Sequence, residues 1–117
     1  MIQMLNRITL IGYVGNARVN TIGGTKVARF TVATTDRYTN KDGETVLSTN
    51  WSEGTAFESP DVTTLERLQK GTPVKLEGRL RQTRYTDSSG AEHYGHEVLV
   101  RSLEIIEGEE RLEYEEH

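Results

Sequence analysis

One stretch of the sequence, residues 74–81, alternates between apolar or small side chains and charged side chains, and the same count continues to Tyr85. Because successive side chains of a β-strand point to opposite faces of a sheet, this alternation separates a core face from a solvent face. The core face holds Val74, Leu76, Gly78 and Leu80. The solvent face holds Lys75, Glu77, Arg79, Arg81 and Thr83, and it ends at Tyr85 with Arg84 beside it. We therefore predict a long strand with a basic outer face that ends in an aromatic ring.

Proteins that bind single nucleic-acid strands combine cations that follow the phosphates with rings on which the bases stack. The predicted strand 73–84 and the ring of Tyr85 fit that description. A solvated basic strand with an incidental tyrosine is the alternative, and the pattern alone leaves it open.

Other stretches rich in β-branched and apolar residues are separated by turn sequences. Gly23-Gly24 indicates a tight hairpin, and Asp87-Ser88-Ser89-Gly90 indicates a second turn. A polar loop over residues 36–48 contains the turn sequence Asn40-Lys41-Asp42-Gly43. The predicted strands are residues 7–14, 18–22, 26–35, 49–57, 73–84 and 93–106.

One segment, residues 60–70, has helical signals. Ser59 suits the N-cap, Pro60 the first helical position and Gly71 the C-terminal stop. The apolar residues Val62, Leu65 and Leu68 recur at helical spacing. We therefore predict one short helix between the third and fourth strands.

This order of elements is typical of an all-β protein with the OB fold, a five-stranded β-barrel with one short helix between strands 3 and 4. An SH3-like barrel or a small α+β domain has similar elements, and the pattern leaves both open. The 117 residues fit a single domain. We predict that residues 1–106 form this domain and that residues 107–117 form a short, disordered acidic tail.

The net charge of −4 is unevenly distributed. Residues 107–117 hold six of the 18 acidic residues and one of the 14 basic residues. The remaining body is nearly neutral, so a local basic face is compatible with the overall charge. The sequence contains no cysteine, which excludes disulfides and thiolate metal sites. No run of residues approaches the ~18 apolar residues of a membrane span, and the first residues lack a secretory pattern, so we expect a cytoplasmic protein.

Two further groups of aromatic residues bear on function. Trp51 and Phe57 share one face of a predicted strand with Glu53, and the pattern does not decide between core and solvent for that face. Tyr38 lies in the polar loop beside Arg37 and Lys41, where it is either a stacking ring or an ordinary exposed tyrosine.

Enzyme signatures are weak. His93 and His96 are three residues apart, which places them on opposite faces of a strand and separates them as metal ligands. Gly23-Gly24-Thr25-Lys26 lacks the first glycine of a phosphate-binding loop. We expect neither an enzyme nor a bound cofactor.

Several segments together resemble one family. Residues 5–12 (LNRITLIG), 30–34 (FTVAT), 71–80 (GTPVKLEGRL) and 84–90 (RYTDSSG) are similar to segments of the bacterial single-stranded DNA-binding proteins. The resemblance covers residues 4–106. It implies an OB-fold homotetramer that binds single-stranded DNA without sequence specificity in DNA replication, recombination and repair.

The resemblance also implies which residues bind DNA. The stacking rings correspond to Tyr38, Trp51, Phe57 and Tyr85. The phosphate contacts correspond to Arg7, Lys75, Arg79, Arg81 and Arg84, with Lys41 as an additional candidate.

Two departures from the family bear most directly on function. Glu53 lies between two ring positions and would repel phosphate. The long tail that ends in acids and a hydrophobic pair is missing, which puts recruitment of repair proteins in doubt. An OB-fold assembly subunit with weakened DNA binding is therefore the second hypothesis.

Overall fold

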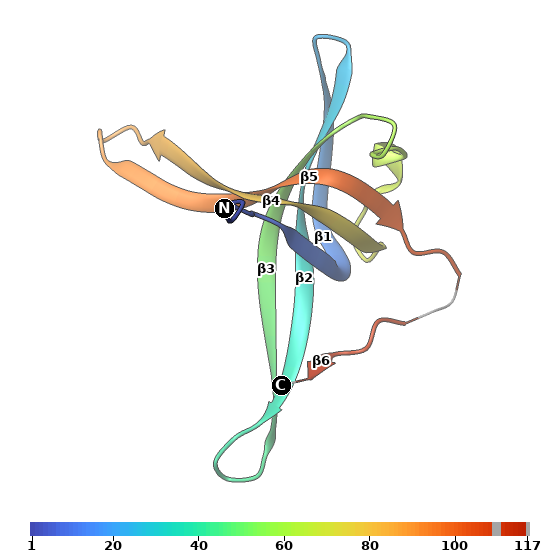
Figure 1. The fold of residues 1–117 in the computed structure, drawn as a ribbon, viewed down its shortest axis with the longest axis vertical. Coiled ribbons are helices and arrows are strands. Elements are labelled where there is room, and N and C mark those ends of the chain that lie inside the picture. Colours follow the sequence, from blue (N-terminus) through green and yellow to red (C-terminus); the bar gives the residue numbers. More distant parts are fainter. Residues whose placement is uncertain (109–110, 117) are drawn as a thin grey trace.

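The computed structural model describes residues 1–108 and 111–116, and it shows a β-barrel from which long hairpins project (Figure 1). The strands are β1 (Ile8–Ile22), β2 (Thr25–Thr39), β3 (Thr45–Phe57), β4 (Pro73–Thr86), β5 (Glu92–Ile105) and β6 (Glu115–Glu116). They lie in the order β1-β4-β5-β3-β2-β6, and a further pairing of β1 with β2 closes the first five into a barrel. The predicted five-stranded OB fold is confirmed.

The first barrel strand is longer than predicted. The segments predicted as strands 7–14 and 18–22 are one continuous strand, β1, so the separation predicted there is wrong. A β-bulge between Val14 and Ala17 bends β1, which lets it pair with β2 along one edge and with β4 along the other. The bulge therefore makes the corner that closes the barrel.

The predicted helix over residues 60–70 is wrong. Only the 3-10 turn η1 (Leu65–Arg67) forms, and Thr64 before it has a left-handed backbone with φ 57°. The backbone of Val62 instead lies extended against β5, where it bridges Leu103. The apolar stripe keeps its packing role, because Val62, Leu65 and Leu68 are all buried. Burial at one end of the barrel thus prevails over the helix propensity of the segment.

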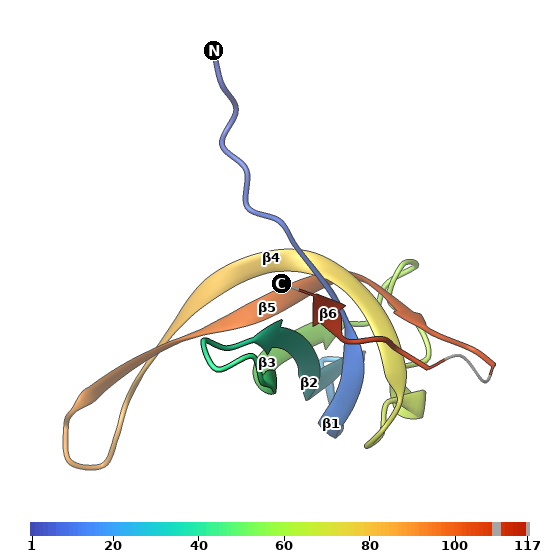
Figure 2. The same cartoon turned by 90° about the horizontal axis from the view of Figure 1, so that it is seen from below.

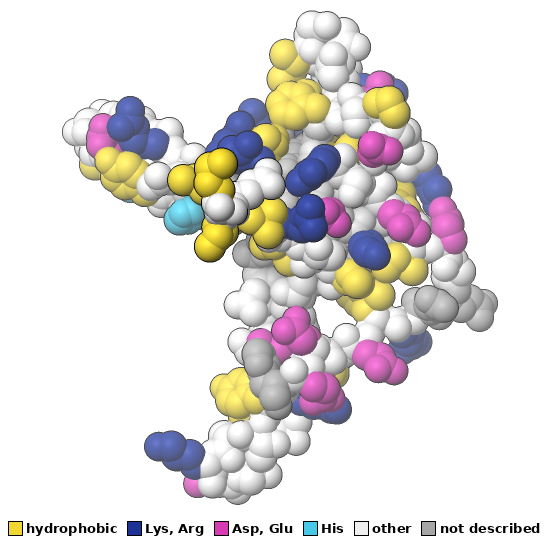
Figure 3. Space-filling model, in the orientation of Figure 1, with side chains coloured by type: hydrophobic (Ala, Val, Ile, Leu, Met, Phe, Trp, Pro, Cys, Tyr) yellow, Lys and Arg dark blue, Asp and Glu magenta, His cyan; other side chains and the backbone are white. Residues whose placement is uncertain are grey.

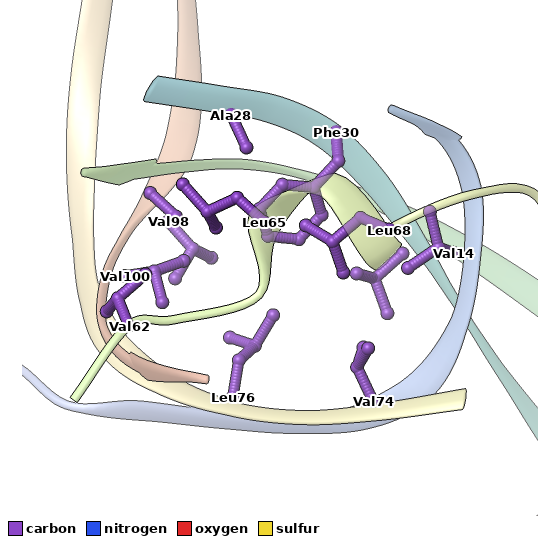
Figure 4. Packing of buried hydrophobic residues seen from close by; sticks show 12 residues of the cluster. Val14, Ala28, Phe30, Val62, Leu65, Leu68, Val74, Leu76, Val98 and Val100 are labelled. Atoms are coloured by element: carbon purple, nitrogen blue, oxygen red, sulfur yellow. The ribbon is translucent and has the colours of Figure 1, made fainter. Parts of the chain in front are cut away.

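The core lies inside the barrel and is formed by the inward residues of all five strands and the η1 segment (Figure 4). Val74 and Leu76 are buried, as the alternation of strand 73–84 predicts. The ring of Phe30 packs over Gly54 on the neighbouring strand, where a Cβ would lie 3.0 Å from the ring. This glycine leaves room for the largest side chain of the core.

Two hairpins continue past the barrel and are called arms here (Figures 1 and 2). The pairing of β1 with β4 ends at Gly78 and the pairing of β3 with β5 begins at Val98, so residues 79–97 form the β4–β5 arm. The pairing of β1 with β2 ends at Ala33, so residues 34–50 form the β2–β3 arm. Leu80 was predicted to be core but is 43% exposed, because it lies in an arm where no other strand covers it.

The chain before β1 extends away from the barrel (Figure 2). Asn6 joins it to β4, because its side-chain amide donates to the Leu80 carbonyl at 2.8 Å and accepts from the Leu80 N–H at 2.9 Å, and Arg7 forms an ion pair with Glu77. The apolar side chains before it, Met1, Ile2, Met4 and Leu5, are exposed.

The described end of the acidic tail lies along β2. The strand β6 pairs in parallel with Asp36 and Arg37. The Leu112 N–H donates to the Tyr13 hydroxyl at 3.0 Å, and Arg37 forms an ion pair with Glu116. Glu109, Glu110 and His117 of the predicted tail lie outside the described residues. The domain boundary at residue 106 stays a prediction.

Candidate nucleic-acid interface

The ring of Tyr85 lies near the tip of the β4–β5 arm and is 63% exposed. Cross-strand pairing brings it beside His93, and the two rings stack with centroids 4.8 Å apart and planes 13° apart. The arm register places Arg79, Arg81 and Tyr85 on one face, as the alternation of the strand predicts. One face of the Tyr85 ring is covered by His93, which leaves the other face for a ligand.

The turn beyond Tyr85 is held together by Asp87. Its carboxylate accepts hydrogen bonds from the Ser89 hydroxyl at 2.6 Å, from the Ser89 and Ala91 amides, and it lies 2.7 Å from His93 Nε2. The hydrogen bond from Ser89, with those from His93 and Ala91, lowers the pKa of Asp87 to about 2. The carboxylate therefore fixes both the turn and the histidine on which Tyr85 stacks.

Trp51 lies where the β2–β3 arm joins the barrel, and it is 61% exposed. The indole lies over Gly15 in the β1 bulge, where a Cβ would be 2.3 Å from Trp51 Cζ3 and 2.8 Å from the Thr31 hydroxyl oxygen. The missing side chain at Gly15 thus makes a seat for the indole. The structure decides the question that the sequence left open, because Trp51 faces solvent.

Phe57 is on the same face of β3 and is 46% exposed. Between the two rings lie Glu53, which is exposed, and Thr55, which is buried and donates a hydrogen bond to Glu97 at 2.9 Å. The inner face of β3 has small residues at Gly54 and Ala56, which are buried. A narrow barrel interior therefore allows the aromatic residues of β3 to face outward.

Glu97 ties the β4–β5 arm to the barrel wall. Its carboxylate accepts from Arg81 Nε at 3.0 Å on β4 and from the Thr55 hydroxyl on β3. Burial works to raise the pKa of Glu97, but the hydrogen bonds from Arg81 and Thr55 outweigh it, and the net pKa lies below the ordinary value. Arg81, a predicted phosphate contact, is therefore already paired with a carboxylate.

Tyr38 is in the β2–β3 arm and is 42% exposed. The register of β2 and β3 is unbroken from Tyr38 to Ala33, the partner of Trp51. Five positions separate Tyr38 from Ala33, so Tyr38 and Trp51 lie on opposite faces of the ribbon. The structure does not bring these two predicted rings together.

The predicted cations fall into two groups. Arg7 pairs with Glu77 at 3.4 Å, and Arg81 pairs with Glu97. The others, Lys41, Lys75, Arg79 and Arg84, form no ion pair with the residues that the structure describes. Lys and Arg side chains gather where the β4–β5 arm leaves the barrel (Figure 3).

Two arginines that the sequence analysis did not single out lie on the outer surface of β1 and β2, next to β3. Arg18 and Arg29 are cross-strand partners on β1 and β2, and both line a hollow of about 650 Å³ beside Glu53. Arg29 alternates with the buried Ala28 and Phe30, so the strand pattern of residues 26–35 was a signal that could have found it.

No metal or membrane site emerges from the described residues. His93 pairs with Tyr85 and His96 with Gln82, which places the two histidines on opposite faces of the arm. Within residues 1–108 and 111–116, no three His, Asp or Glu side chains are grouped so that they could hold a metal ion. Nor does this part of the chain contain a helix long and apolar enough to span a membrane.

The closed five-stranded barrel places the chain in the class of OB-fold proteins. Its outer surface carries exposed aromatic rings and cations. The sequence model of the single-strand binding protein family matches residues 5–106, and the chain belongs to that family.

Known proteins agree with this assignment. The chain is 29% identical over 110 residues to a single-stranded DNA-binding protein of Xanthomonas axonopodis pv. citri, which covers 92% of this chain and 61% of the relative. It is 29% identical to single-stranded DNA-binding protein 1 of Chlorobaculum tepidum, with 91% of this chain and 67% of the relative covered. The chain thus spans about two thirds of the length of these curated relatives.

A solved structure, described as the Plasmodium falciparum SSB complex with ssDNA, has the same fold. The TM-score is 0.78 at 24% sequence identity, and the match covers 92% of this chain and 99% of the other.

Proposed function

We propose that this protein binds single-stranded DNA by stacking bases on exposed aromatic rings and by contacting phosphates with lysine and arginine. The observation that carries the proposal is the exposure of Trp51 and Tyr85 on a wall that also presents cations. A buried indole and phenol would have opposed it. Because every base has a flat face and every nucleotide a phosphate, this mode of binding accepts any sequence.

The test is a titration with oligo-dT, followed by the fluorescence of Trp51, which is the single tryptophan of the chain. Stacking of a base on the indole should quench the emission. The association constant should fall linearly with salt on logarithmic axes, because phosphate contacts release counterions. Unchanged fluorescence at low salt, together with no shift of the oligonucleotide in a native gel, overturns the proposal.

The cations suited to the phosphates are those that form no ion pair with the described residues: Lys41, Lys75, Arg79 and Arg84. Arg7 and Arg81 must exchange a carboxylate for a phosphate, which lowers their contribution. Phe57 and Tyr38 complete the ring set, with Tyr38 reaching a strand that passes around the edge of the β2–β3 arm.

A second candidate is an OB-fold assembly subunit with weak DNA binding. Glu53 on the ring-bearing face and the pairing of Arg81 with Glu97 favour it. A stable oligomer that shows no response to oligo-dT selects this candidate.

We further propose a homo-oligomer, a homotetramer by resemblance to the family. Apolar residues near the N-terminus are exposed in the single chain, and burial against another copy would remove them from water. Light scattering coupled to gel filtration measures the mass, and a monomer at micromolar concentration contradicts this assembly.

Family membership supports a proposal about the cellular setting. We propose that the protein works in the cytoplasm on the nucleoid, where it protects single strands in replication, recombination and repair.

A further inference from the structure

A hollow of about 650 Å³ lies on the outer wall of β1, β2 and β3. Asn16 and Thr31, which line it, are next to the seat of the indole, since Thr31 and Trp51 both lie close to Gly15. The volume is in the range of small-ligand sites. The lining residues that matter for recognition are Asn16, Arg18, Arg29, Thr31, Glu53 and Glu97.

The charged side chains that line the hollow differ in whether they already have hydrogen-bond or ion-pair partners. Glu97 is held by Arg81 and Thr55, so its oxygens are already occupied. Glu53 is exposed and forms no hydrogen bond or ion pair through its side chain with the described residues. Arg18 and Arg29 are cross-strand partners on β1 and β2, and both line the hollow, where the charge of Arg29 also acts on Glu97. A ligand therefore meets one open carboxylate and a pair of guanidinium groups.

Glu53 and Trp51 are two positions apart on one face of β3, a spacing of about 7 Å along the strand. A base stacked on the indole would thus have its hydrogen-bonding edge near the carboxylate. Thr31, the cross-strand partner of Glu53, also lines the hollow, and its hydroxyl oxygen accepts from the Asn16 N–H at 3.1 Å. The phosphate of the same nucleotide could then lie toward Arg18 and Arg29, away from Glu53.

We propose that this hollow is a nucleobase subsite and that Glu53 gives it a preference for guanine. This inference rests on the proposed binding of single-stranded DNA. A carboxylate only accepts hydrogen bonds. Guanine presents two donors side by side, N1–H and the N2 amine, which match the two carboxylate oxygens. Thymine presents a single N–H between two carbonyl oxygens, and those oxygens are repelled.

Adenine and cytosine fall between these extremes, because each presents one amino group beside an acceptor nitrogen. Paired hydrogen bonds to a base edge discriminate between bases by roughly fivefold to somewhat over a hundredfold. Binding remains general, because the other rings do not read base edges. The subsite adds a modest preference at one position of a strand that is otherwise bound without regard to sequence.

The test compares three oligonucleotides of equal length by competition. One is oligo-dT, one carries isolated deoxyguanosines among the thymidines, and one carries deoxyinosine at the same positions. Isolated guanines avoid four-stranded structures, and inosine lacks the N2 amine. The wild-type protein should bind the guanine oligonucleotide about tenfold more tightly than oligo-dT, with inosine close to oligo-dT.

The variant E53Q should lose most of this preference. The matched control is E58Q, which removes the same charge one residue beyond Phe57 and outside the hollow. E58Q should keep the preference. Both glutamates are exposed, so the variants should unfold at the temperature of the wild type.

Each other result overturns the inference. If the wild type binds all three oligonucleotides with equal affinity, the guanine subsite is rejected, whereas the proposed binding of single-stranded DNA still stands. If E53Q keeps the preference for guanine, another residue causes that preference. Uniformly tighter binding of every oligonucleotide by E53Q, with no wild-type preference, makes Glu53 only a repulsive charge. No binding of any oligonucleotide at low salt rejects the proposed function itself.

Discussion

The phenol ring of Tyr85 stacks on the imidazole of His93, with ring centroids 4.8 Å apart and an interplanar angle of 13°. The imidazole is itself fixed by Asp87 at 2.7 Å. The tip of the β4–β5 arm thus carries an aromatic platform with a defined orientation. Ordering the ring before DNA arrives reduces the entropy that binding must overcome.

The variant Y85A should weaken binding of oligo-dT by about 1–3 kcal/mol, the contribution that base–aromatic stacking makes in this class of protein. The control is Y94A, since Tyr94 is 61% exposed in the same arm but lies on the other face. Fluorescence titration of Trp51 gives both affinities. Equal losses for Y85A and Y94A would show that the face assignment of the arm is wrong.

The turn that holds His93 should depend on pH through Asp87. Its pKa is lowered to about 2 by the hydrogen bonds from Ser89, His93 and Ala91, while the value in an unfolded chain is near 3.8. A lowered pKa adds stability that is complete above the unfolded value and is lost as the pH falls through the folded value. The amide signals of Ser89 and Ala91 should therefore shift with a midpoint near pH 2 in NMR spectra. A midpoint near pH 4 would contradict the hydrogen-bonded turn.

The variant G15A should displace the indole of Trp51, because the new Cβ would lie 2.3 Å from Trp51 Cζ3. We expect a shifted tryptophan emission maximum and weaker binding of oligo-dT. The matched change is G95A, where the nearest atom is the Thr83 hydroxyl oxygen at 3.1 Å, far from the indole. If G15A retains wild-type emission and affinity, Gly15 is not the seat of the indole.

The variant E97Q should lower the free energy of unfolding by about 1 kcal/mol, since a carboxylate that joins β3 and β4 would lose its charge. It should also release Arg81 for phosphate, so the salt dependence of DNA binding should steepen by less than about one counterion. Urea denaturation and titrations at several salt concentrations measure the two effects. The control E104Q removes an exposed carboxylate from the same strand. Unchanged stability in E97Q would show that the arm is held by pairing of its strands alone.

Local alternation predicted much of this structure. The residues of β4 fall on the faces that their order implies, from the buried Val74 to the exposed Tyr85. What failed depends on contacts distant in sequence. Leu80 is exposed because β1 stops pairing with β4 at Gly78, and no periodicity of strand 73–84 contains that information. The segment around Val62 does not form the predicted helix, because the backbone of Val62 pairs with Leu103 of β5.

The candidate site, like the fold, could be predicted only in part from the sequence. Ring and cation types were visible in the sequence, but their grouping depends on strand register. Register places Tyr38 on the face opposite Trp51, and it brings His93 under Tyr85. It also pairs Arg18 with Arg29, in the hairpin that turns at Gly23-Gly24. A bulge in β1 is the least visible feature, although it makes the seat of Trp51.

The acidic tail gives a last prediction, because its described part lies against β1 and β2 of the barrel. Leu112 donates to the Tyr13 hydroxyl, and Glu116 pairs with Arg37. A chain that ends at Gly108 loses five acids and one base, so its repulsion of a DNA strand should fall. We expect oligo-dT to bind several-fold more tightly to this chain at low salt, and the difference should vanish near 1 M salt, where charges are screened beyond about 3 Å. The control R37A breaks the ion pair but keeps the acids, so it should leave most of the repulsion in place. Weaker binding by the shortened chain would mean that the tail supports the DNA-binding wall instead of competing with the strand.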